Sequence, residues 1–333
     1  MIIRELDPSR VEADLAAVLP LWREFTGNVF GRAFRWGPTQ LRESTGRGPT
    51  RFGLTLAAFA GPAETEPVGF AYVTMATKEN VDSGDVLVLL RADQEQDPGA
   101  AAAAALLAVA RERLAAAGRA KLTVNVAADP APGYAPLVLG PSVFTALFMT
   151  LDLAAADPRQ LDSWAAPGPA NDAYRLVRWI DRCPDDLVES FAVATAAMDD
   201  APVEALELDH ARLTVERIRA GEKFRTECGV QMHVVAAVAP AGEIAGTCLV
   251  SRYPDEPDNV GIATTSVLRG HRGHGLGLRI KADSTRWLRE LYPETRWIYT
   301  FNNHTNEYML AVNHRMGYQH VCTWHLYLHA TGM

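Results

Sequence analysis

Apolar residues recur with two different spacings along the first half of the chain. Helical spacing predicts helices at residues 11–25 and 98–117, and the second carries an apolar face. Gly118 ends that helix. Short apolar runs bounded by turn residues predict strands at 1–6, 52–60, 68–75, 85–91 and 120–126. The first half therefore mixes strands with helices.

The second half begins with a predicted strand at 174–180 and a helix that Pro184 starts. The apolar face of this helix comprises Leu187, Phe191, Ala194 and Met198. Another helix follows Thr214, and a turn with Pro240 and Gly242 joins two strands in an antiparallel hairpin. The remaining elements are predicted at 260–267 (strand), 275–291 (helix), 296–301 (strand), 305–316 (helix) and 318–328 (strand).

The order of elements is similar in the two halves. The second half reads β-α-α-β-β-β-α-β-α-β, and the first has a strand triplet followed by a long helix and a strand. At 333 residues the chain exceeds the roughly 250–300 residues at which a single core stops growing. Residues 156–172 mix Pro, Gly, Asp and Ala without periodicity, as interdomain connections do. We expect domains at 1–155 and 173–333, joined by a linker at 156–172.

Charge and composition narrow the classes of function. The net charge of −8 argues against non-specific nucleic-acid binding, which needs clustered Lys and Arg. The start has no signal-peptide pattern and no run of 18 apolar residues occurs, so we expect a cytoplasmic protein that does not bind membranes. The four cysteines form no CxxC pair, so we expect reduced thiols and no metal site.

The strongest chemical signal lies between the strand that ends at Val267 and the next helix. The loop between them holds four glycines and two arginines: Arg269, Gly270, Arg272, Gly273, Gly275 and Gly277. Glycine lets backbone N–H groups approach an anion, and a helix N-terminus adds partial positive charge. The segment is therefore typical of a phosphate-binding loop.

Spacing excludes two common phosphate loops. A dinucleotide fingerprint G-x-G-x-x-G that starts at Gly273 finds Leu278 in its third glycine position, and one that starts at Gly275 finds Ile280. A P-loop that starts at Gly270 has Leu276 where lysine is required. A nucleotide-binding regulatory protein is therefore a poor fit.

The pattern R-x-x-G-x-G from Arg272 to Gly277 resembles the GNAT superfamily of N-acetyltransferases. A second segment, TFNNHTNEYMLAVNHRMGY, is similar to the closing part of that family, with Asn306, a helix, and Gly317 before the last strand. The resemblance implies an α/β (α+β) fold with two tandem GNAT-like domains. Each domain would be a mixed, mostly antiparallel sheet flanked by helices.

The resemblance also implies acetyl-CoA as the co-substrate, bound by the C-terminal domain. The loop amides would bind its pyrophosphate, the strand at 260–267 would pair with its pantetheine arm, and the Val267 amide would polarise the thioester carbonyl. The residues expected to bind the cofactor are Thr265, Ser266, Val267, Arg269, Arg272, Gly273, His274, Gly275, Leu276, Gly277, Asn302, Asn306, Met309 and Asn313. His271 and His274 are expected beside phosphate, not on a metal.

The sequence departs from the family where many members carry a tyrosine that donates a proton to the leaving thiolate. Asn313 stands there, and an amide is a poor proton donor. Candidates for a general base are Asp199, in the pair with Asp200, and His233 in a central strand; a solvated helix end and a core histidine are the simpler explanations. In the first half, Gln96 to Ala101 matches Q-x-x-G-x-A but lacks an arginine and contains Pro98, so we expect a degenerate copy.

These features predict an enzyme that transfers an acetyl group from acetyl-CoA to a primary amine of a small molecule or peptide by direct attack. Propionyl or succinyl remains open as the acyl group. The alternative is a non-catalytic acyl-CoA-binding sensor or scaffold protein. Either a monomer or a homodimer fits, because a tandem pair can imitate the dimer of single-domain relatives.

Overall fold

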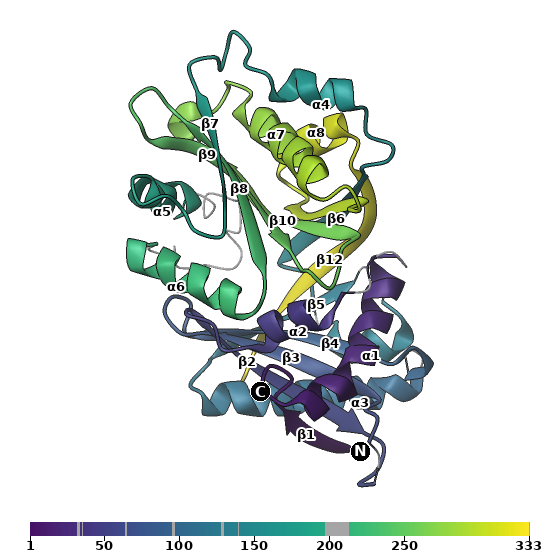
Figure 1. The fold of residues 1–333 in the computed structure, drawn as a ribbon. Coiled ribbons are helices and arrows are strands. Elements are labelled where there is room, and N and C mark those ends of the chain that lie inside the picture. Colours follow the sequence, from purple (N-terminus) through teal and green to yellow (C-terminus); the bar gives the residue numbers. More distant parts are fainter. Residues whose placement is uncertain are drawn as a thin grey trace. The chain divides into compact units, whose positions relative to one another are not determined.

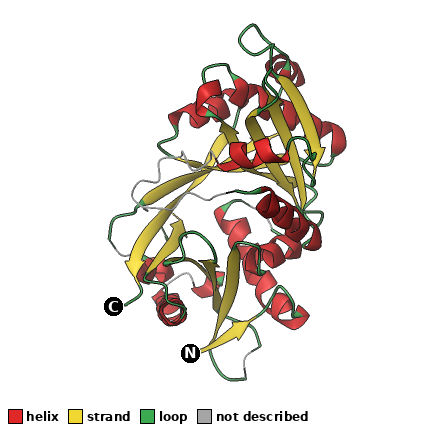
Figure 2. Ribbon diagram, turned by 90° about the vertical axis from the view of Figure 1, so that its left-hand side faces the viewer, coloured by secondary structure: helices red, strands yellow, loops and turns green. Residues whose placement is uncertain are grey.

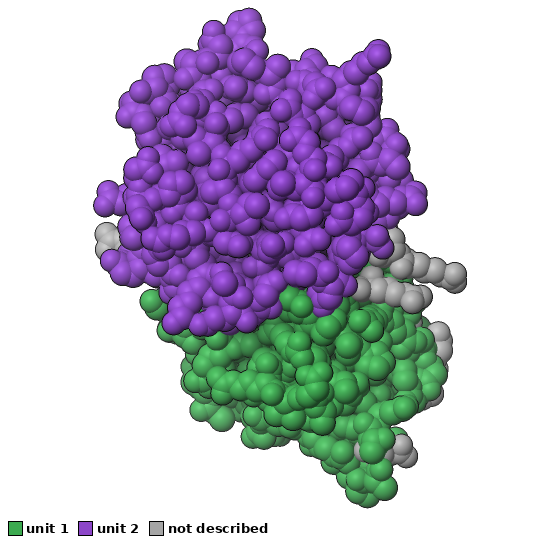
Figure 3. Space-filling model, in the orientation of Figure 1, with its two compact units in different colours: residues 1–146, 203–209, 322–333 green, residues 147–202, 210–321 purple. Residues whose placement is uncertain are grey.

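The computed structural model describes residues 1–31, 34, 36–63, 65–94, 97–127, 130–138, 140–196 and 213–332. The chain divides into two compact units (Figures 1 and 3). Unit 1 comprises residues 1–146, 203–209 and 322–333, and unit 2 comprises residues 147–202 and 210–321. Figure 2 shows helices beside the strands of each unit. The part of the chain described here holds no helix that is both long and apolar enough to span a membrane.

The sheet of unit 1 has the strand order β1-β2-β3-β4-β5-β12. Its strands are β1 (Ile2–Leu6), β2 (Arg51–Phe59), β3 (Gly69–Ala76), β4 (Ser83–Leu90), β5 (Lys121–Ala127) and β12 (Gln319–Ala330). Strands β4 and β5 are parallel, and the other neighbours are antiparallel. The helices are α1 (Glu12–Val29), α2 (Pro38–Thr45) and α3 (Asp97–Ala116), with short 3-10 turns η1 (Ala92–Gln94) and η2 (Pro132–Leu137).

The sheet of unit 2 has the order β6-β11-β10-β9-β8-β7. Its strands are β6 (Phe144–Asp152), β7 (Arg175–Ile180), β8 (Gln231–Val238), β9 (Ile244–Arg252), β10 (Asn259–Val267) and β11 (Trp297–Asn303). Strands β10 and β11 are parallel, whereas β7 to β10 are antiparallel. The helices are α4 (Pro158–Ala165), α5 (Val188–Ala196), α6 (Val215–Glu227), α7 (Leu276–Leu291) and α8 (Glu307–Met316), with a 3-10 turn η5 (Arg269–His271).

The central strands of unit 2 are buried on both faces. Along β8, Val235 and Ala237 pack into a core with residues of α4, α7 and α8, while Val234 and Ala236 pack into a second core with residues of α5 and α6. Alternate residues of a strand point to opposite faces, so this division places α7 and α8 on one face and α5 and α6 on the other. The expected mixed, mostly antiparallel sheets flanked by helices are confirmed.

The repeat is visible in the order of elements within the units. In unit 2, β10 leads through η5 and α7 to its parallel neighbour β11, and in unit 1, β4 leads through η1 and α3 to its parallel neighbour β5. Each unit takes its last strand from the opposite half of the sequence: most of β12 belongs to unit 1, and most of β6 to unit 2. The units therefore divide the chain at other residues than the linker expected at 156–172.

Candidate functional site

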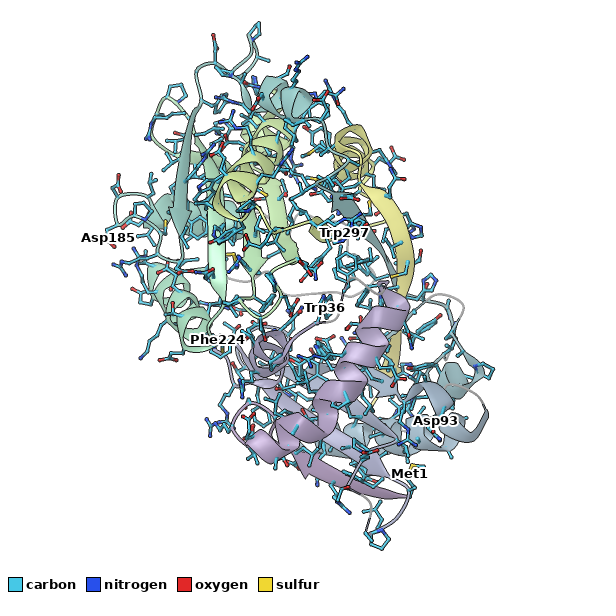
Figure 4. The ribbon with its side chains drawn as sticks, turned by 45° about the vertical axis from the view of Figure 1, so that its right-hand side comes forward. Met1, Trp36, Asp93, Asp185, Phe224 and Trp297 are labelled. Atoms are coloured by element: carbon cyan, nitrogen blue, oxygen red, sulfur yellow. The ribbon has the colours of Figure 1, made fainter. Side chains whose placement is uncertain are left out.

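The parallel strands β10 and β11 pair at one end and separate at the other. Their register runs from Asn259 with Trp297, which Figure 4 labels, to Ile262 with Thr300. A register shift between Ile262 and Thr264 follows in β10. Such a bulge bends a strand and ends regular pairing. We call residues 263–267 of β10 and 301–303 of β11 the strand divergence.

Backbone groups of β10 point into the strand divergence. The Leu268 amide donates to the Ala245 carbonyl beside β9 at 2.8 Å. Because successive residues of a strand direct their N–H groups to opposite sides, the amides of Thr265 and Val267 point away from β9. They face the side on which β11 has separated. This part of β10 therefore offers donors for an extended ligand and places the Val267 amide at its end.

The glycine-rich loop has the backbone that its glycines predict. Gly273 and Gly275 have φ of +85° and +71°, in the left-handed region that favours glycine. Gly275 is the N-cap of α7 and offers no side-chain cap, so the first-turn amides of α7 remain donors for an anion. Arg269 and Arg272 are exposed in the loop, and Arg272 Nε donates to the Val267 carbonyl at 3.2 Å.

Residues 165–174 hold this loop in place. Asn171 Nδ2 donates to the His274 carbonyl, and His274 Nδ1 donates to the Ala170 carbonyl, both at 3.0 Å. The buried guanidinium of Arg279 donates to three carbonyls of the same segment, those of Ala165, Asn171 and Tyr174. The segment predicted to be a linker thus contains α4 and a support for the loop that the sequence did not reveal.

The loop histidines contact protein groups. His271 Nδ1 is hydrogen-bonded to the Tyr174 hydroxyl at 3.1 Å, and His271 Nε2 lies 3.4 Å from a carboxylate oxygen of Glu243. Among the described residues, no three His, Cys, Asp or Glu side chains form a group that could hold a metal ion. The two histidines therefore brace the loop in this structure.

Asn306 and Met309 of the α8 segment make different contacts. Asn306 is its N-cap, and the Asn306 side chain accepts a hydrogen bond from the Met309 amide at 3.0 Å. Met309 packs against the core on the α7 face. Near the start of α8, the half-exposed Tyr308 ring lies 3.5 Å from where a Cβ on Gly277 would be. Tyr308, absent from the sequence predictions, therefore borders the glycine-rich loop.

Asn313 and Asn302 belong to a buried polar network. The Asn313 side chain is fully buried; its Nδ2 donates to Asn302 Oδ1 at 2.8 Å, and its Oδ1 accepts a hydrogen bond from Lys281 Nζ. Lys281 is 1% exposed, and burial lowers the pKa of its ammonium to about 8. Lys281 was not predicted as a site residue, although Ile280, Ser284 and other neighbours on the same face of α7 are buried.

Thr265 and Ser266 lie on opposite faces of β10. Thr265 Oγ1 donates to Cys248 Sγ at 3.6 Å on the α7 face. Ser266 Oγ donates to the Ala194 carbonyl of α5 at 3.3 Å and lies 3.2 Å from Thr247 Oγ1. The hydroxyl groups of Ser266 and Thr247 therefore lie on the α5 face of the sheet beside the strand divergence.

Of the candidate bases, the structure describes His233. His233 is fully buried, hydrogen-bonded through Nε2 to the Tyr292 hydroxyl at 2.8 Å, and burial lowers the pKa of its imidazole to about 4. His233 lies level with Ile262 in the register of the sheet. Val267 lies level with Ala237, which is about 13 Å further along β8, so His233 is distant from the Val267 amide. Asp199 and Asp200 lie outside the described residues.

Unit 1 differs from unit 2 at the corresponding positions. The Arg91 amide donates to the Val68 carbonyl, so the Leu90 amide points to the opposite side of β4, where it donates to the Tyr134 hydroxyl at 3.0 Å. A Cβ on Gly99 would lie 1.5 Å from the Gln94 carbonyl oxygen, so that oxygen packs against the first turn of α3. In unit 1 a protein hydroxyl therefore accepts from the amide that corresponds to Val267 in unit 2. Gln96 lies outside the described residues.

Comparison with known proteins supports the resemblance. Residues 196–318 match the model of the acetyltransferase (GNAT) family. A tandem GNAT protein from the clavulanic acid biosynthesis pathway is 22% identical with a TM-score of 0.78, covering 100% of this chain and 99% of its own. A GCN5-related N-acetyltransferase from Sphaerobacter thermophilus is 15% identical with a TM-score of 0.63, covering 99% and 95%.

A third structure is similar over most of the chain. Saccharomyces cerevisiae N-myristoyltransferase with bound myristoyl-CoA is 12% identical with a TM-score of 0.59, covering 98% of this chain and 79% of its own. No protein among those with curated functions matches the sequence. Residues 196–318 are thus similar to the acetyltransferase (GNAT) family, and the whole chain has the fold of a tandem GNAT protein.

Proposed function

We propose that unit 2 binds acetyl-CoA and transfers the acetyl group to a primary amine of a small molecule or peptide. The observation that carries this proposal is the alignment of two sets of donors. Amides of the glycine-rich loop and of the first turn of α7 lie at one end of the site. The Thr265 and Val267 amides line the strand divergence next to it. A pyrophosphate bound at the loop and an extended pantetheine arm along β10 use both sets.

The reaction is a direct attack of the neutral amine on the thioester carbonyl carbon. Negative charge then develops on the carbonyl oxygen, and the Val267 amide donates to it. One such donor is worth about 3 kcal/mol of transition-state stabilisation. The amine loses a proton to a general base or to water, and Asp199, which lies outside the described residues, stays a candidate for that base.

Arg269 and Arg272 place two positive charges beside the loop that would hold the pyrophosphate. In unit 1, protein atoms lie at the corresponding positions: the Gln94 carbonyl packs against Gly99, and the Tyr134 hydroxyl accepts from the Leu90 amide. We therefore propose one cofactor site per chain.

Isothermal titration of acetyl-CoA tests the cofactor site. We expect binding near one equivalent for the intact protein and no binding for the double variant Arg272→Glu, Gly275→Trp. Arg113→Glu on α3 makes the same charge change in unit 1 at an exposed residue and should leave binding intact. Failure of the intact protein to bind would refute the proposal, and two equivalents would place a second site in unit 1.

The non-catalytic alternative rests on Asn313, whose amide is held by Lys281 and Asn302 and lacks an acidic proton. Release of free coenzyme A during incubation with a panel of amines separates the two functions. Turnover with any amine favours the enzyme. Binding of acetyl-CoA without release of coenzyme A favours a sensor or scaffold.

A further inference from the structure

A group of polar side chains lies on the α7 face of the strand divergence. We call it the Lys281 cluster, and its members are Cys248, Thr265, Lys281, Asn302, Asn313 and Tyr318. Thr265 and Asn302 come from β10 and β11, and both lie beyond the last paired residues of those strands. Lys281 Nζ is bonded to Asn313, which is bonded to Asn302. The cluster therefore spans the divergence from one strand to the other.

The ammonium of Lys281 has no carboxylate among its described neighbours. From β9, Cys248 faces it, and from the segment after α8, the Tyr318 ring lies 4.4 Å from Nζ. Burial raises the pKa of the Cys248 thiol and of the Tyr318 phenol, so both stay neutral near pH 7. Asp283, on the same helix, is paired with Arg178 at 2.5 Å. A neutral amide and an aromatic ring thus surround the ammonium.

A buried lysine without a counter-charge is costly to the fold. Desolvation of an ammonium is only partly offset by one hydrogen bond and one cation–π contact. Leucine or methionine would fill the same position on the apolar face of α7 without that cost. A charge retained at such a cost, beside a candidate site, points to a chemical role.

We propose that Lys281 donates a proton to the thiolate that leaves when the acetyl group is transferred. This inference rests on the proposed function. The amine nitrogen forms a bond to the carbonyl carbon, the carbon–sulfur bond breaks, and its electron pair goes to sulfur. A proton passes from Lys281 Nζ to sulfur, giving free coenzyme A. Neutral Lys281 regains a proton from solvent as product leaves, and the amine proton goes to water or a base.

The acid and the thiolate are well matched. Transfer is most effective when the donor has a pKa near that of the acceptor and near the working pH. The pKa of Lys281 is about 8, and that of an alkyl thiol is about 8.5. An unperturbed lysine, with a pKa of about 10.4, would be a weaker acid by roughly two units. Burial in the Lys281 cluster therefore adjusts this ammonium for the task.

Two variants separate proton donation from structure. Lys281→Met keeps a similar volume and removes a buried charge, a change that is often neutral or stabilising, so we expect a folded protein. Lys281→Arg keeps a positive charge but cannot give up a proton, because a guanidinium stays protonated. Unfolding curves of both variants show whether they fold.

The first test is the ionisation of bound coenzyme A, followed by ultraviolet absorbance of its thiolate from about pH 6 to about pH 10. An ammonium beside the sulfur should lower the pKa of the bound thiol by about one unit or more from about 8.5. Lys281→Met should lose this shift, and Lys281→Arg should keep part of it. Equal thiol pKa values in wild type and Lys281→Met overturn the inference.

The second test is turnover with an amine that the wild type accepts. Lys281→Met and Lys281→Arg should lower kcat about 100-fold, as expected for loss of a general acid, with the affinity for acetyl-CoA unchanged. Unchanged kcat in both variants overturns proton donation while the proposed acetyltransferase stands. Absence of coenzyme A binding by wild type refutes the proposed function and the inference with it, so the two failures are distinguishable.

Discussion

Replacing Lys281 by methionine should change how the stability of unit 2 depends on pH. The pKa of Lys281 is about 8 in the folded protein against 10.5 for the free side chain. Between these values the unfolded chain still holds a proton that the folded chain has released. Since stability rises with pH wherever the unfolded state binds more protons, Lys281 makes the folded protein more stable as pH increases through this window.

The size of the effect follows from the shift. Each unit of pKa shift corresponds to about 1.4 kcal/mol, so burying the ammonium costs the folded state about 3 kcal/mol below pH 8. Lys281→Met removes this cost but leaves Asn313 Oδ1 without its donor, a loss of about 1–3 kcal/mol that does not depend on pH. The two proteins should therefore be close in stability at neutral pH, and wild type should gain about 3 kcal/mol on the variant by about pH 10.5.

Urea unfolding at several pH values, followed by tryptophan fluorescence, measures this difference. Groups that titrate in both proteins cancel when the two free energies of unfolding are subtracted. Lys223→Met on α6 is a matched control, because the Lys223 side chain is 77% exposed and its pairing with Glu227 contributes little. A difference between wild type and Lys281→Met that stays constant with pH would refute a buried, titrating Lys281.

Three further outcomes are expected. Arg178→Met should lower the free energy of unfolding by about 3–5 kcal/mol, because it leaves the buried Asp283 carboxylate unpaired; chemical denaturation measures this, and a loss under 1 kcal/mol would contradict it. Asn171→Ala should weaken acetyl-CoA binding about fivefold by releasing the His274 carbonyl, measured by isothermal titration, with unchanged affinity as the contrary result. The pKa of His233 is about 4 in the folded protein and 6.5 for the free side chain, so the free energy of unfolding should fall by about 3 kcal/mol as pH drops through this range. His233→Phe should show a smaller fall in acid unfolding. An equal fall in both proteins would contradict a buried, neutral His233.

Much of the fold was predictable because its elements carry local signals. The glycines that begin α7 and end α8 have the positive φ expected of them, and the strand before the loop ends at Val267 as predicted. Helix α4 was missed, although Asp157 caps it and Pro158 occupies its first position. The exchange of β6 and β12 between the halves was not predictable from periodicity, because a strand's pattern reports burial but does not name its partner.

The candidate site was predictable where backbone geometry makes it and unpredictable where long side chains complete it. The glycine-rich loop and Val267 follow from spacing alone. Arg279, which binds three carbonyls of residues 165–174, and Lys281 lie next to that motif, yet both read as ordinary charged residues of an amphipathic helix. Their burial depends on α4 and α8, which are distant in sequence, so only the folded structure brings the partners together.

The two repeats show how a binding site can be closed while its scaffold stays. In both units the residue after the last strand position donates to the neighbouring antiparallel strand, which turns the preceding amide toward the parallel one. In unit 1 that amide donates to the Tyr134 hydroxyl, and the Gln94 carbonyl oxygen packs against Gly99 in the first turn of α3. We propose that unit 2 uses the equivalent donors to bind a ligand, with Lys281 on the α7 face of the strand divergence. Donors with a protein acceptor stabilise the fold, whereas donors without one can bind a ligand. For this reason we propose the cofactor site in unit 2 and a structural role for unit 1.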